Sequence, residues 1–101
     1  MLTGKQKSYL RSQANTMQPI IQVGKSLVTE TVVDTIIKAL EARELIKVSV
    51  LQNCLAEPTE VANVIAEHAD AQIVQVIGRV IIIYKKSSNP ANRSITNKIP
   101  R

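Results

Sequence analysis

Residues 72–85 read QIVQVIGRVIIIYK, two runs rich in Val and Ile that Gly78 and Arg79 separate. Branched apolar residues favour strands, so we expect one strand over residues 72–77 and another over residues 80–85. Glycine at the first central position of a two-residue loop favours a type II′ turn, which joins antiparallel strands. The stretch therefore predicts a β-hairpin.

Two strand–helix units precede the hairpin. The first combines a short strand over residues 20–23 with an amphipathic helix over residues 29–43, which Thr29 can cap. The second combines an alternating strand over residues 46–50 with a helix over residues 58–69. Such units form right-handed crossovers, so we expect each to lead to a parallel neighbour in one sheet.

A further helix is expected over residues 3–15, where Thr3 and Gln6 fit a capping box. The order α-β-α-β-α-β-β predicts an α/β fold, with a mixed four-stranded sheet and the long helices packed mainly on one face. A length of 101 residues fits one domain. We place this domain over residues 1–86 and expect residues 87–101, which are polar, to form a flexible basic tail.

The formal net charge of +5 is unevenly distributed along the chain. All eight acidic residues lie within residues 30–70, whereas residues 1–29 and 71–101 carry only basic charges. If the two ends of the chain meet in the fold, they form a basic face suited to a polyanion such as nucleic acid. The alternative is that the asymmetry serves solubility alone.

Several features argue against other classes of protein. Cys54 is the only cysteine, so no internal disulfide can form. The N-terminus opens no apolar run of the kind that marks a signal peptide, and the longest apolar stretch, residues 80–84, is too short to span a membrane. We therefore expect a cytoplasmic protein without a membrane partner.

Candidate catalytic residues are isolated from one another. His68, the only histidine, and Cys54 have no partner at a spacing typical of a metal or nucleophile site. Glu41 and Glu44 are one helix turn apart, and we interpret both as surface charges. We expect no enzymatic activity, no metal, no cofactor and no small-molecule substrate.

Six short segments occur in a distinctive order. They are LTGKQK at 2–7, VGK at 23–25, TE at 29–30, ELIKV at 44–48, VQVIG at 74–78 and IYK at 83–85. Together they resemble the CRM domain (chloroplast RNA splicing and ribosome maturation), especially the bacterial YhbY-type proteins, over about residues 2–86. The resemblance implies a fold similar to the C-terminal domain of bacterial translation initiation factor three. It also implies an RNA-binding protein that associates with ribosomal RNA of large-subunit precursors during ribosome assembly. We expect the protein to be a monomer.

The RNA-binding motif of this family is a GxxG loop after the first strand. It maps to Gly24, Lys25, Ser26 and Leu27, so Leu27 replaces the second glycine. A loop that leads into a helix N-terminus offers free backbone N–H groups to an anion. Gly24 permits a positive φ and the close approach of a ligand, while Lys25 and Ser26 add a charge and a hydroxyl donor. The alternative is that Gly24 only ends the strand and Ser26 caps the helix.

Two further basic clusters are candidate contacts to RNA phosphates. The first, on the helix over residues 3–15, could track phosphates beside the loop; it comprises Lys5, Lys7 and Arg11. The second comprises Arg79 at the hairpin turn, Lys85 and Lys86. The basic residues of the tail would add non-specific attraction.

Two other functions fit part of the same pattern. An Alba-like protein has a similar order of strands and helices and a basic surface, and it would bind duplex nucleic acid as a dimer. A protein-interaction adaptor would instead use the acidic middle segment as its working surface.

Overall fold

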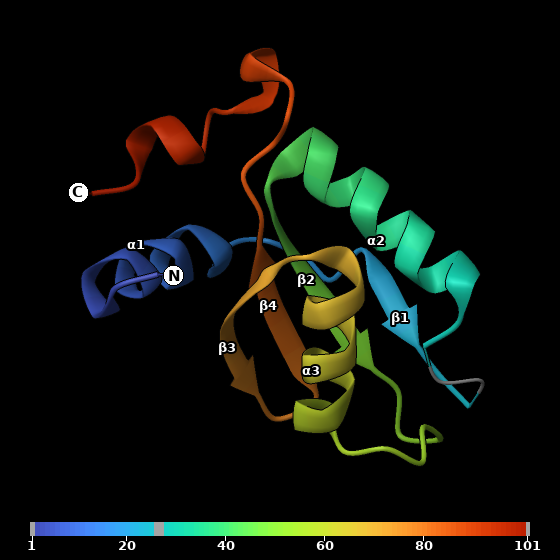
Figure 1. Cartoon of the computed structure of the whole chain (residues 1–101). Helices are drawn as coiled ribbons and strands as arrows, with labels where there is room; N and C mark the ends of the chain where they lie inside the picture. The colour runs from blue at the N-terminus through green and yellow to red at the C-terminus, as the bar shows by residue number, and fades with distance from the viewer. Residues whose placement is uncertain (1, 26–27, 101) are drawn as a thin grey trace.

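The helices and strands follow the predicted order in the computed structural model, which describes residues 2–25 and 28–100 (Figure 1). They are α1 (Gly4–Ala14), β1 (Ile21–Val23), α2 (Glu30–Arg43), β2 (Leu45–Val50), α3 (Pro58–Ala69), β3 (Gln72–Ile77) and β4 (Val80–Tyr84). Two short 3-10 helices, η1 (Pro90–Asn92) and η2 (Thr96–Lys98), follow. The predicted α/β class and the mixed four-stranded sheet are confirmed.

The first two helices begin where their capping residues predict. Thr3 Oγ1 accepts a hydrogen bond from the backbone N–H of Gln6 at 3.1 Å, and Gln6 Oε1 accepts one from the Thr3 N–H at 2.9 Å. These two bonds complete the capping box. At the start of α2, Thr29 Oγ1 accepts from the Val32 N–H at 3.2 Å. Both predicted caps are confirmed.

The sheet has the strand order β1-β2-β4-β3. β1 and β2 are parallel, with Ile21 opposite Val48, as the first crossover predicts. The prediction that the second crossover leads to a parallel neighbour is wrong, because β4 lies between β2 and β3 and is antiparallel to both. β4 suits the central position because its residues 81–84 are buried, whereas β3 has exposed Gln72 and Ile77 at its ends.

The β3–β4 turn and the edges of the sheet have distinct backbone features. Gly78 has a φ of 56° and Arg79 does not have a positive φ, which fits the predicted type II′ turn rather than type I′. The pairing of β3 with β4 shifts between Ile73 and Gln75. The other edge strand, β1, has three residues. Both edges of the sheet are therefore short or irregular.

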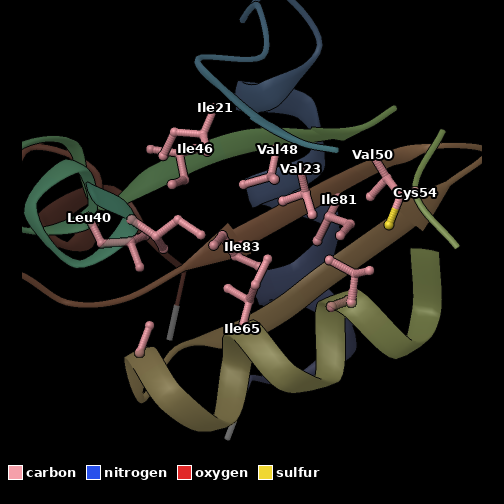
Figure 2. Packing of buried hydrophobic residues seen from close by; sticks show 14 residues of the cluster. Ile21, Val23, Leu40, Ile46, Val48, Val50, Cys54, Ile65, Ile81 and Ile83 are labelled. Carbon is pink, nitrogen blue, oxygen red and sulfur yellow. The ribbon is translucent and has the colours of Figure 1, made fainter. Parts of the chain in front are cut away.

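Apolar side chains fill both faces of the sheet. The helices α2 and α3 cover one face, over a cluster that contains Leu40, Ile65 and Ile83 (Figure 2). The other face is covered by α1, whose Leu10 and Ala14 join a smaller cluster with Leu45, Val74, Ile82 and Tyr84. Burial of one leucine contributes roughly 1.5–3 kcal/mol. The expectation that the long helices share one face is confirmed, and α1 is docked on the opposite face.

Residues 87–100 fold back over the domain (Figure 1). Ser87 is buried, and Ile95 and Ile99 pack against the smaller apolar cluster beside α1. The predicted flexibility of this tail is a property of the protein in solution and stays a prediction. The contacts nevertheless bring the basic C-terminal segment next to the basic α1.

Candidate nucleic-acid interface

The carboxyl ends of β1 and β2 meet the β3–β4 turn at one end of the sheet, which we call the loop end. The Leu51 N–H donates to Val23 O at 2.8 Å, and the Val50 N–H donates to Arg79 O at 2.7 Å. These bonds hold the segment that starts at Gly24 near the hairpin turn. The predicted RNA contacts at the loop end are Gly24, Lys25 and Arg79.

Gly24 is a glycine that the fold itself does not require. It does not have the positive φ that glycine permits, so that part of the prediction is wrong. A Cβ at this position would lie 3.4 Å from Leu51 Cδ1 and 3.5 Å from Asn53 Oδ1, which are ordinary contact distances. A side chain at this position would therefore fit the fold without strain, so the fold alone does not explain the glycine.

Lys25 follows Gly24 and is exposed, as expected for a contact to a polyanion. The neighbouring residues Ser26 and Leu27 lie outside the described residues. The role predicted for Ser26, and the effect of leucine in place of the second motif glycine, therefore stay predictions.

Arg79 stabilises the end of β2 through two hydrogen bonds. Its Nε donates to Val50 O at 2.9 Å and its Nη2 donates to Leu51 O at 2.7 Å. Guanidinium has five N–H donors, so three remain for other partners. Arg79 can therefore add positive charge at the loop end while it holds the strand that supports Gly24.

The basic residues of α1 do not lie beside the loop. Lys5 and Arg11 are exposed and Lys7 is half-buried, on a helix that covers the start of β2 and the end of β4. Figure 1 shows α1 and the carboxyl end of β1 on opposite sides of the molecule. The expectation that α1 lines phosphates next to the loop is therefore corrected, because the apolar face of α1 docks elsewhere on the sheet.

Lys85 and Lys86 follow β4 at the opposite end of the sheet, which we call the tail end. Lys85 Nζ donates to Ala69 O at 3.3 Å, at the carboxyl end of α3, and Lys86 is exposed. The distance along β4 from Arg79 to Lys85 is about 20 Å at the usual rise per residue. The predicted RNA contacts thus form two groups rather than one patch.

Glu44 organises the tail end. The expectation that it is a surface charge is therefore wrong. Its side chain is fully buried. Its carboxylate accepts hydrogen bonds from the Ser87 N–H at 2.8 Å, from the Thr96 N–H at 2.9 Å and from the Thr96 hydroxyl. Glu44 also ends α2 with a φ of 67°, a conformation usually left to glycine. Its partners lie 43 and 52 residues away, so no local pattern announces them.

Three titratable groups at the tail end have shifted pKa values. Burial raises the pKa of Glu44, but hydrogen bonds from Thr96 and Ser87 outweigh burial and hold it below the ordinary 4.5. The hydroxyl and N–H of Ser88 lower the pKa of Glu41. Burial raises the pKa of Tyr84 above 10.0, and the nearby charge of Glu44 adds to this. The tail is therefore anchored to ionised carboxylates and a neutral tyrosine.

The described part of the chain offers few other chemical features. Residues 2–25 and 28–100 contain no group of three or more His, Cys, Asp or Glu side chains placed to hold a metal ion. Within the same residues, no helix has the length and apolar character needed to cross a bilayer. Cys54 is buried in the larger apolar cluster.

Comparison with known proteins connects this geometry to a family. Residues 2–85 match the CRS1/YhbY (CRM) domain. The chain is 53% identical over 87 residues to the "Probable RNA-binding protein YqeI" of Bacillus subtilis, which covers 86% of this chain and 91% of that protein. It is 34% identical over 86 residues to an "RNA-binding protein" of Haemophilus influenzae, which covers 85% of this chain and 87% of that protein.

A solved structure has the same fold. The solution structure of the Staphylococcus aureus protein SAV1595, which carries a provisional RNA-binding description, superimposes with a TM-score of 0.79 at 44% sequence identity. The match covers 99% of this chain and 100% of that chain, so the likeness extends beyond the four-stranded sheet to residues near both termini.

Proposed function

The chain belongs to the CRS1/YhbY (CRM) domain family, and from this premise we propose that it binds RNA through the loop end of its sheet. Gly24 carries the proposal, because the fold shows no internal need for glycine there and a ligand could approach its backbone closely. The exposed charge of Lys25 and the partly free guanidinium of Arg79 support it. The names of the relatives, which describe RNA-binding proteins, point to the same class of ligand.

The bound RNA is expected to be recognised mainly through its backbone and shape. Proteins that read single-stranded bases use several aromatic stacking platforms. This chain has two aromatic residues, and one of them, Tyr84, is buried with its hydroxyl 2.6 Å from Thr96 Oγ1. Phosphate contacts from lysine and arginine then supply most of the affinity and make it dependent on salt.

At a finer level, we propose that the RNA is ribosomal RNA of large-subunit precursors, bound in the cytoplasm during ribosome assembly by a monomer without catalytic activity. This proposal extends the resemblance of the sequence to the bacterial YhbY-type proteins. The family match favours it over the Alba-like and adaptor hypotheses.

Two measurements test the proposal at its two levels. Fluorescence anisotropy with labelled fragments of large-subunit ribosomal RNA, in competition with duplex DNA, should show preference for the structured RNA and a steep salt dependence. Equal affinity for duplex DNA would favour the Alba-like hypothesis instead.

Sedimentation of cell lysate in a high-magnesium sucrose gradient should place the protein with large-subunit precursors, and RNase should release it. Migration as free protein in the gradient, both with and without RNase treatment, would contradict the role in assembly.

A further inference from the structure

A hollow of about 720 Å³ lies at the tail end of the sheet. Its walls come from the start of α1, the start of β3, the end of β4 and the folded tail. Binding sites for small molecules and nucleotides commonly have volumes of roughly 300–1,000 Å³. Its size and composite walls make this hollow a candidate binding site that is distinct from the loop end.

Three cations and one carboxylate line this hollow: Lys85, Lys86, Arg93 and Asp70. Arg93 Nε donates to Ser87 O at 2.9 Å and Lys85 Nζ donates to Ala69 O at 3.3 Å, so backbone carbonyls hold both cations in place. The ion pair found within residues 2–25 and 28–100 is Lys38–Asp34, away from the hollow. Within those residues the lining cations have no carboxylate within ion-pair distance, although the charge of Lys85 helps to lower the pKa of Glu41 nearby.

The tail wall of the hollow is fixed by the buried anchor. Hydrogen bonds to an ionised carboxylate are stronger than neutral ones, and Glu44 accepts three of them from Ser87 and Thr96. Gln6 Nε2 adds a bond to Pro100 O at 3.1 Å from the side of α1. These bonds hold Arg93, which lies between Ser87 and Thr96 in the chain, at the hollow.

The remaining lining suits the other parts of a nucleotide. The amide of Asn97 can donate to and accept from a base or a ribose, and the amide NH2 of Gln72 can donate, since Gln72 Oε1 already accepts from the Leu2 N–H at 2.8 Å. Leu2 and Ile99 add apolar surface. The Glu44 carboxylate beneath the tail wall is already satisfied by its three donors, so it does not compete for the lining cations by direct pairing.

We infer that this hollow binds a nucleotide unit, with its phosphate at Lys85, Lys86 and Arg93. The unit is either part of the RNA that the loop end contacts or a free mononucleotide. The first case rests on the proposed RNA-binding function, and it makes the tail a second RNA contact at the opposite end of the sheet from Gly24.

The test compares two double variants that lose the same charge. Lys86→Ala with Arg93→Ala removes two lining cations, whereas Lys38→Ala with Arg43→Ala removes two exposed cations of α2. The first variant should bind ribosomal RNA fragments about 10-fold more weakly than wild type, and the control within about 2-fold, because direct phosphate contacts outweigh general attraction. Equal losses in the two variants would overturn the RNA contact at the hollow.

A second pair of variants changes the charge without removing a cation. Asn97→Asp adds a negative charge to the lining, and Asn63→Asp adds one on the exposed side of α3. Both residues are exposed, so both variants should fold as wild type, which the dispersion of their amide NMR spectra checks. Weaker RNA binding for Asn97→Asp alone supports the RNA contact at the hollow, and equal affinities contradict it.

NMR titration of the full chain identifies the source of the nucleotide unit. Shifts of the Lys85, Lys86 and Asn97 amides with adenosine monophosphate, beyond those with inorganic phosphate, indicate a free mononucleotide. Shifts at the same amides with RNA alone indicate an RNA contact. Absence of shifts with both probes overturns the inference. If wild type does not bind RNA at low salt, the proposed function fails. If it binds RNA and Lys25→Ala weakens binding, while the tail-end variants match their controls and adenosine monophosphate shifts none of the three amides, this inference alone fails.

Discussion

The loop end and the tail end of the sheet are both basic, but they are built in different ways. At the loop end, Gly24 and Lys25 extend from β1, and their support consists of local strand contacts and Arg79. At the tail end, Lys85 and Lys86 lie beside a segment that a buried carboxylate, Glu44, holds in place. Both ends are held by contacts between residues far apart in the sequence, but at the loop end these contacts join neighbouring strands, whereas at the tail end they converge on one buried carboxylate.

The two ends should therefore respond differently to amino-acid substitution. Substitutions at the loop end are expected to alter ligand binding with little effect on stability, because its key side chains are exposed or absent. Substitution of Glu44, the anchor of the tail end, should alter stability first, because it breaks buried hydrogen bonds.

Glu44→Ala should produce the largest loss of stability, about 2–4 kcal/mol, because it leaves buried N–H donors of Ser87 and Thr96 without their charged acceptor. Urea unfolding measures this change in the free energy of unfolding. Glu44→Gly is the matched control: it also removes the carboxylate but suits the positive φ, so it should be less destabilising by about 1 kcal/mol. A loss below about 1 kcal/mol for Glu44→Ala would contradict the anchoring role.

Acid should loosen the tail end before the loop end. The pKa of Glu44 is lowered in the fold, so its contribution to stability is complete above its ordinary value of 4.5 and is lost as the pH falls through the lower folded pKa. Glu41 acts in the same direction. Amide NMR signals of Ser87 and Thr96 should therefore change below about pH 4.5 before those of Val50 and Leu51 do. Simultaneous change at both ends would contradict this order.

Lys25→Ala should weaken RNA binding about 3- to 10-fold, by a similar factor for different RNA sequences, because the lysine contacts phosphate rather than bases. Its salt dependence should flatten, with the slope of log K against log salt falling by about 1. Lys38→Ala, which removes an equal charge from α2, serves as the control. An unchanged affinity and slope for Lys25→Ala would remove this residue from the interface.

Gly24→Ala should leave the free energy of unfolding within about 0.5 kcal/mol of wild type, since the new Cβ meets only ordinary contacts and the backbone needs no positive φ. RNA affinity should still fall, because the new methyl group would occupy the space through which we propose that RNA approaches the Gly24 backbone. Thermal unfolding and anisotropy on the same sample measure both effects. A stability loss that accounts for the weaker binding would show that Gly24 serves the fold instead.

Local signals made most of the fold predictable from the sequence. The Thr3–Gln6 capping box, the Thr29 cap and the glycine of the hairpin act over a few residues, and each leaves a pattern that can be read directly. The insertion of β4 between β2 and β3 was missed, although the uninterrupted apolar run of β4 is typical of a central strand.

The candidate site was predictable in part. The loop motif identified Gly24 and Lys25 as candidates, but the position of α1 relative to that loop depends on how its apolar face docks on the sheet. Glu44 could not be recognised, because an acidic residue at a helix end normally faces solvent and its partners lie in a segment with the composition of a disordered tail. Hydrogen bonds between residues this far apart leave no periodic pattern in the sequence.

The edges of the sheet bear on how the protein behaves at high concentration. An exposed strand edge is a template on which another chain can add a strand, and long regular edges promote aggregation. Here β1 is three residues long and the pairing of β3 is shifted between Ile73 and Gln75, so neither edge offers an extended, regular row of free backbone groups. The same backbone irregularities therefore work against intermolecular β-sheet growth by the folded chain.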